Sequence, residues 1–273
     1  MRAGLMLLLA TALAGCSNAT PDGKASATPE VRASASAATA AAPSSATEPP
    51  PAQARKVSEE NDLYQFAYSY PAQASAIPAL KTLLDADMAA KKADLAKDAA
   101  EGRKDAKANG YPFNAYFHST DWQVVTDLPG WFSLSSLVGF YTGGAHPNYV
   151  FDTILWDKAA NRRRDPADLF TSKAALSAAI RKPFCKELDR QRLKKRGEPL
   201  GSGISEFEQC IDPTDETVIL GSAGHKGFDR VGVLVPPYEA GPYAEGSYEV
   251  TVPVTPAVLA AVKPEYRAAF MAP

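Results

Sequence analysis

The sequence contains few histidines and cysteines, two residue types on which many catalytic metal and nucleophile sites depend. Its 273 residues include three histidines and three cysteines. The histidines, His118, His146 and His225, lie in distant segments and form no H-E-x-x-H or H-x-x-x-H metal pattern. The chain also has no G-x-S-x-G nucleophile turn and no phosphate-binding glycine loop. We therefore predict no metal, no cofactor and no catalytic residue.

The chain also lacks a strong charge of either sign. It carries 29 Lys and Arg against 31 Asp and Glu, for a net charge of −2. The part that follows residue 56 has a net charge of about −4, which is mildly acidic. Proteins that bind nucleic acid usually present a basic surface, so no nucleic-acid partner is expected. A cationic partner is compatible with this charge but is not required by it.

Long apolar runs are missing except for one at the N-terminus. Leu5 to Ala14 follow Arg2 and fall short of the roughly 20 residues that span a bilayer, which is typical of a secretory signal. The run ends in L-A-G-C, which resembles the lipobox of bacterial lipoproteins. The resemblance implies a signal peptide over residues 1–15 and acylation of Cys16, although an ordinary secretory signal cut slightly later is the alternative. Ser17 after the cysteine resembles outer-membrane sorting, so we expect an exported protein, lipid-anchored in the cell envelope at the outer membrane and facing the periplasm.

Residues 16–56 have almost no large apolar side chain. They are rich in Ala, Ser, Thr and Pro, and include the run ASASAATAAAPSSATEPPPAQA. Such a composition cannot bury enough surface to offset the entropy lost on ordering. We predict a disordered tether between the lipid and a folded domain.

Two cysteines remain within the domain after Cys16 is set aside. An even pair in an exported protein favours a disulfide between Cys185 and Cys210. Two separately buried thiols are the alternative.

The remaining sequence mixes helical and strand patterns without a regular alternation, which predicts an α+β fold with mixed or antiparallel sheets. A long N-terminal helix is expected over about 77–109 and a second helix over about 173–195, which Pro183 should kink or divide. Alternating apolar residues predict strands over 62–71, 116–126, 132–141 and 149–156. Further strands are expected near 218, 229–236 and 247–254, and a short helix after Pro256.

Three stretches together resemble a known family. They are YTGGAHPN (141–148), DPADLF (165–170) and PPYEAGPYAEGSYEVTVPV (236–254). In this order they resemble the extracytoplasmic domain shared by RsiV-type anti-sigma factors and the non-catalytic part of PdaC-type peptidoglycan deacetylases. The resemblance implies two abutting modules, a PdaC-type α+β module over 57–160 and an RsiV-like module over 161–273. In the RsiV-type proteins this region binds lysozyme directly, so the resemblance also implies a binding function.

Two loops hold the candidate binding residues. In the first, Gly143 and Gly144 permit positive φ and Pro147 stiffens the exit, so we expect His146 to shape a turn. The alternatives for His146 are contact with a ligand, and a role as metal ligand or general base. In the second, the density of Pro, Gly and Tyr predicts a rigid bent loop. Tyr238 and Tyr243 in this loop either pack over it or form a binding surface.

Taken together, these features predict a lipid-anchored, non-catalytic envelope protein that binds a lysozyme-type protein or peptidoglycan. The alternatives are a peptidoglycan-modifying hydrolase or deacetylase with an unrecognised site, and an accessory lipoprotein that binds another envelope protein. The membrane is expected as a partner only through the lipid.

Overall fold

The computed structural model of the chain describes residues 51–198, 201 and 203–272, which all belong to one structural unit. The expected signal peptide, Cys16 and most of the expected tether lie outside the described residues. No helix among the described residues is both long enough and apolar enough to cross a membrane.

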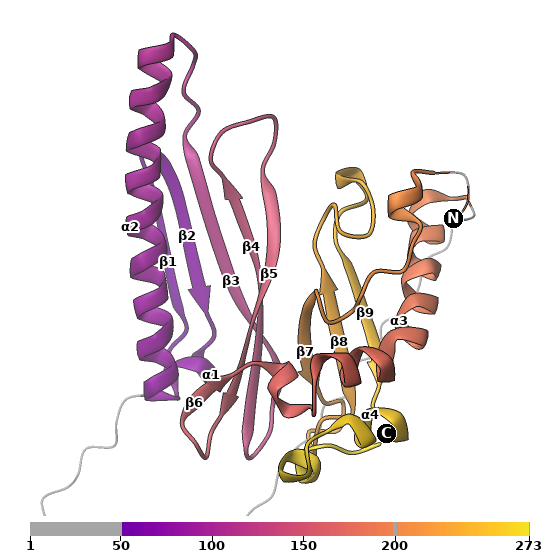
Figure 1. Cartoon of the computed structure of the whole chain (residues 1–273). Helices are drawn as coiled ribbons and strands as arrows, with labels where there is room; N and C mark the ends of the chain where they lie inside the picture. Colours follow the sequence, from indigo (N-terminus) through magenta and orange to yellow (C-terminus); the bar gives the residue numbers. More distant parts are fainter. Residues whose placement is uncertain (1–50, 199–200, 202, 273) are drawn as a thin grey trace, which may run out of the picture. The chain divides into compact units, whose positions relative to one another are not determined.

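The first sheet has six strands in the order β1-β2-β3-β4-β5-β6 (Figure 1). All neighbours are antiparallel except β2 and β3, which are parallel. A parallel pair needs a long crossover, and helices α1 and α2 supply it between these two strands. The strand β1 was not expected, and it starts slightly before the predicted module boundary at residue 57. The bounds are β1 Arg55–Glu60, β2 Tyr64–Tyr70, α1 Ala72–Ser75, α2 Pro78–Asn109, β3 Tyr116–Asp127, β4 Trp131–Tyr141, β5 Asn148–Asp157 and β6 Arg162–Arg164.

The helix α2 packs on one face of this sheet although its apolar stripe is narrow. Tyrosine hydroxyls of β2 compensate, because they reach carboxylates on the helix: Tyr68 donates to Asp87 at 2.8 Å and Tyr70 to Asp85 at 2.6 Å. The helix ends at Gly110, whose φ of 73° is favourable for glycine. The buried residues that join strand and helix are Tyr64, Phe66, Tyr68, Tyr70, Leu80, Leu84 and Leu95.

The second sheet consists of β7 (Thr217–Gly221), β8 (Arg230–Val235) and β9 (Tyr248–Pro253), all antiparallel. It shares a core with α3 (Lys173–Arg196), which buries a residue every fourth position, and with α4 (Pro256–Ala261). The α3 residues in this core are Leu176, Ile180, Phe184 and Leu188.

The helix α3 begins as predicted at a Ser172 cap, whose Oγ accepts a hydrogen bond from the Ala175 N–H at 3.0 Å. It runs through Pro183 as one helix, so of the two expected outcomes the helix is kinked and not divided. Figure 1 shows its two halves pointing in different directions, as expected when proline removes a helical hydrogen bond.

The two sheets meet at β5 and β7. The Thr217 hydroxyl donates to the Phe151 carbonyl at 3.2 Å. Leu155 of β5 and Leu128 of the β3–β4 turn belong to the core of the second sheet. The predicted α+β fold is therefore confirmed. The predicted division into modules at residue 160 stays a prediction, because the described residues belong to one unit and β6 of the first sheet lies beyond that boundary.

Candidate binding site

The loop between β4 and β5 presents an exposed histidine on a glycine-rich turn. Gly143 and Gly144 have φ values of 98° and 105°, where any other residue would be strained. The Tyr141 hydroxyl donates to the Gly144 carbonyl at 3.0 Å, which fixes the turn. His146 Nδ1 lies 2.7 Å from the Pro147 carbonyl oxygen, so this nitrogen carries the proton and Nε2 is free to accept.

The second loop, residues 236–247, connects β8 to β9. Tyr238 is 45% exposed and has a φ of 76°, an uncommon conformation for tyrosine. Its N–H donates to the Gly241 carbonyl at 3.1 Å, which closes a tight turn. Tyr243 begins a short 3-10 helix, Tyr243–Glu245.

The fold brings the three predicted binding residues together. The Tyr238 hydroxyl lies 3.0 Å from His146 Nε2, although the two residues are 92 positions apart. The Tyr243 ring stacks on the imidazole, with centroids 4.0 Å apart and planes 26° apart. His146 therefore does more than shape its own turn, because it joins the two loops.

An open groove of about 360 Å³ lies beside these residues. Tyr243 and Pro237 line it from the second loop, and Leu137 and Tyr149 line it from β4 and β5. Gly139 makes room for the Tyr149 ring, because a Cβ at this position would lie 3.0 Å from it. We call the groove, together with His146 and Tyr238 beside it, the aromatic groove.

The aromatic groove combines apolar surface with a few polar groups. Leu137 is 44% exposed, which is unusual for a leucine in a central strand. Partial desolvation and the nearby Tyr149 and Tyr238 hydroxyls raise the pKa of Tyr243, so its hydroxyl remains a neutral hydrogen-bond donor at physiological pH. Apolar walls with a few oriented polar groups are typical of binding sites.

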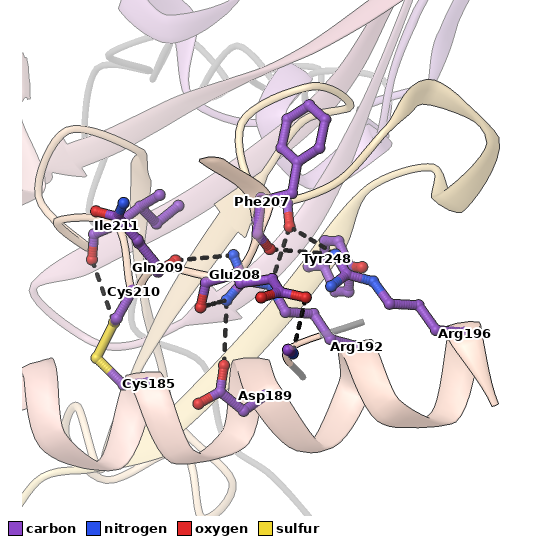
Figure 2. A network of polar contacts seen from close by, with 12 residues as sticks. Cys185, Asp189, Arg192, Arg196, Phe207, Glu208, Gln209, Cys210, Ile211 and Tyr248 are labelled. Carbon is purple, nitrogen blue, oxygen red and sulfur yellow. Dashed lines mark hydrogen bonds and ion pairs between the residues drawn. A yellow bond between two sulfur atoms is a disulfide. The ribbon is translucent and has the colours of Figure 1, made fainter. Parts of the chain in front are cut away.

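Arginine side chains from α3 hold the second loop in place. Figure 2 shows the same arginines beside the segment that precedes Cys210. The Arg192 side chain is fully buried, and its Nε donates to the Ala240 carbonyl at 2.9 Å. Its other nitrogens donate to the Gln209 carbonyl at 3.0 Å and to the Asp189 carboxylate at 3.1 Å. One guanidinium thus connects the tyrosine loop with the segment that precedes Cys210.

Two further basic residues of α3 fix the end of this loop. Arg196 forms an ion pair with Glu245 at 2.7 Å, and the carboxylate of Glu245 also accepts from the Tyr248 hydroxyl. The Arg196 guanidinium accordingly lowers the pKa of Glu245 against the effect of its burial. Lys195 donates to the carbonyls of Glu245 and Ser247, at 2.7 and 2.5 Å. Tyr243 therefore projects from a loop whose base is tied to a helix.

The disulfide between Cys185 and Cys210 is present, with the Cα atoms 5.5 Å apart. It connects α3 to the same segment whose carbonyls Arg192 binds (Figure 2). The predicted pairing is therefore found, and it anchors one side of the Arg192 network.

The other two histidines lie apart from the aromatic groove. His118 stacks on Phe66 in the first sheet, and burial lowers its pKa to about 4. His225 is exposed in a turn, with a φ of 54°. Within the described part of the chain, no group of three or more His, Cys, Asp and Glu residues is arranged to hold a metal ion.

One carboxyl group outside the groove has an unusual environment. Glu216 lines a polar pocket of about 230 Å³ together with Asp152 and Arg163. Burial, and then the nearby carboxylates of Glu239 and Asp215, raise its pKa to about 7. Glu216 could therefore exchange a proton near neutral pH.

The sequence analysis did not identify Leu137, Tyr149, Arg192 or Glu216. Leu137 and Tyr149 look like ordinary strand residues in the sequence. They line a groove because the face of the first sheet on which they lie is partly uncovered. Arg192 lies in a helix that ends in three basic residues, which is typical of a solvated end.

Comparison with known proteins gives one family match, over the first part of the folded region. Residues 57–149 match the family model described as "Deacetylase PdaC", which confirms the resemblance over these residues. No curated protein matches the chain. Solved structures of the DUF3298 family are similar. One from Bacteroides fragilis shows 18% identity and a TM-score of 0.44 over 74% of this chain and 89% of its own. One from Pseudomonas aeruginosa shows 14% identity and a TM-score of 0.44 over 78% and 95%.

Proposed function

We propose that this chain, whose residues 57–149 form a PdaC-type domain, is a lipid-anchored, non-catalytic binding protein of the cell envelope. The observation that carries the proposal is the convergence of His146, Tyr238 and Tyr243 from two distant loops at an open groove. The lipobox-like L-A-G-C, which ends at the acylation site Cys16, supports lipid anchoring. Ser17 after it supports the outer membrane, with the domain in the periplasm.

The groove suits a macromolecular partner. Interface hot spots are enriched in tyrosine on a rigid support, because a fixed aromatic ring loses little entropy on binding. The bonds from Arg192, Lys195 and Arg196 provide that support here. We propose a lysozyme-type protein as the partner, and peptidoglycan is the alternative ligand.

Charge supports the first of these partners. Lysozymes of the common host type are cationic, and the folded part of this chain has a net charge of about −4. Opposite charges accelerate the encounter more than they strengthen the final complex. Raised ionic strength should therefore slow association and leave dissociation almost unchanged.

The test is titration of the immobilised full-length protein with lysozyme at two ionic strengths, alongside an equally cationic unrelated protein. Tyr243→Leu should weaken lysozyme binding at least about tenfold if the ring is an anchor residue. His146→Asn should weaken binding as well, whereas His225→Asn, a matched change in an exposed turn, should leave it unaltered. Equal binding of the unrelated protein would refute lysozyme recognition. Co-sedimentation with purified peptidoglycan tests the alternative ligand.

The environment of Glu216 favours a second candidate function, a peptidoglycan-modifying enzyme. A carboxyl group with a pKa of about 7 in a polar pocket has the protonation behaviour of a general acid or base. Release of products from peptidoglycan by the purified protein, abolished in Glu216→Gln but retained in Tyr243→Leu, would support this function. If the purified protein releases no products from peptidoglycan, the enzymatic function is refuted and the binding function remains.

A further inference from the structure

A second pocket lies on the other side of the β4–β5 loop, next to the C-terminal end of α2. Its volume is about 320 Å³, and we call it the tip pocket. Three of its walls are the side chains of Phe113, Tyr116 and Tyr141, and Tyr111 stands at its side with half of its surface exposed.

The aromatic walls of the tip pocket are inclined to one another. The Tyr116 and Tyr141 rings are 82° apart with centroids 6.4 Å apart, and Phe113 lies 5.5 Å from Tyr116 with the planes 32° apart. Several aromatic rings inclined around one space are the arrangement found in cages that bind organic cations.

A glycine within the helix α2 accommodates this arrangement. A Cβ at Gly102 would lie 2.2 Å from the Tyr116 hydroxyl oxygen, so only glycine lets the ring take its place. Glycine in a helix interior costs about 1 kcal/mol relative to alanine. Glycine is present despite this cost at the position that determines where the Tyr116 ring lies.

One carboxylate next to the tip pocket favours a cation. Among the described residues, the lining of the pocket includes no charged side chain of either sign. The Tyr111 hydroxyl donates to the Asp105 carboxylate at 2.5 Å, and this contact raises the pKa of Tyr111. A carboxylate thus lies directly behind one aromatic residue, and the faces of the other rings are themselves partly negative.

We infer that the tip pocket binds an organic cation, the ammonium or guanidinium group of a Lys or Arg side chain on a partner protein. The inference does not depend on the aromatic groove, because the residues that form the two sites are different. The tip pocket would bind such a group even if the groove bound nothing.

The test uses choline and 3,3-dimethyl-1-butanol, which share their shape but differ in charge. NMR titration of the full-length protein should show choline binding about tenfold more tightly than the neutral compound. Tyr111→Leu should remove most of this preference and Asp105→Asn should reduce it, whereas Tyr111→Phe should keep most of it because the ring remains. Circular dichroism checks that each variant is folded.

His225→Asn, a change in an exposed turn outside both sites, is the control and should bind choline like the wild type. Equal affinity for the two compounds would overturn the inference, as would no detectable choline binding. A loss of choline binding in Tyr243→Leu with none in Tyr111→Leu would place the cation in the groove and would also overturn it.

Discussion

Replacing Arg192 by methionine should destabilise the fold and loosen the tyrosine loop. Arg192 is fully buried and bonds the carbonyls of Ala240 and Gln209 at 2.9 and 3.0 Å. The Ala240 carbonyl belongs to a fully buried residue, and a buried acceptor that loses its partner costs about 1–3 kcal/mol. Removal of the buried charge itself offsets part of this. Gln209 is exposed and the Asp189 side chain is 39% exposed, so the bonds to them add little. We expect the free energy of unfolding to fall by about 1–3 kcal/mol.

Arg190→Met on the same helix is the matched control. Arg190 is 62% exposed and pairs with Glu187 at 2.6 Å, so its loss should cost less than about 1 kcal/mol. Urea unfolding measures both free energies, and amide hydrogen exchange reports on residues 236–247. In Arg192→Met these amides should exchange faster than in the control. Equal stability of the two variants, or unchanged exchange in the loop, would refute the role assigned to Arg192.

Three further predictions concern other parts of the chain. Cys185→Ala should lower the free energy of unfolding by about 2–5 kcal/mol, and alkylation of the unreduced wild type followed by intact-mass measurement should reveal no free thiol in the domain. Two alkylated thiols would contradict the disulfide. Because the folded pKa of Glu216 is raised from 4.5 to about 7, its neutral form stabilises the fold below pH 4.5, and this contribution disappears as the pH rises to 7. Glu216→Gln should therefore flatten the fall in melting temperature between pH 4.5 and 7, and an unchanged slope would show that Glu216 titrates normally. Cys16→Ser should release the protein from the membrane fraction, whereas fractionation and migration like the wild type would rule out lipidation.

Most of the fold could be predicted because apolar periodicity dominates it. The strands β2 to β5 and β7 to β9 alternate or contain continuous apolar runs, and α2 ends at a glycine as expected. The strand β1 has the sequence RKVSEE, with one apolar residue, and within the described part of the chain it is an edge strand paired with β2 alone. Backbone pairing stabilises such a strand, and backbone pairing leaves little trace in the side-chain pattern.

The candidate site could be predicted in its parts but not in its assembly. His146, Tyr238 and Tyr243 were each identified from loop composition. Their contact depends on how β7 docks against β5, where the Thr217 hydroxyl meets the Phe151 carbonyl. No local sequence pattern predicts this packing of β7 against β5, because it depends on contacts between the two hydrophobic cores.

The network beneath the tyrosine loop was partly visible in the sequence. Cys185, Asp189, Arg192 and Arg196 recur at intervals of four, three and four residues, which places them on one face of a helix. A helix face with a cysteine and three charged residues is typical of a face exposed to solvent. The sequence shows no side chains that would pair with all of these charges in a buried site. The partners of the two arginines are mainly backbone carbonyls, those of Phe207, Gln209 and Ala240. Because every residue type has the same backbone carbonyl, the sequence does not reveal such partners. The predicted disulfide on that helix face does indicate that a second segment of the chain packs against it. An arginine buried under that segment needs hydrogen-bond acceptors from it.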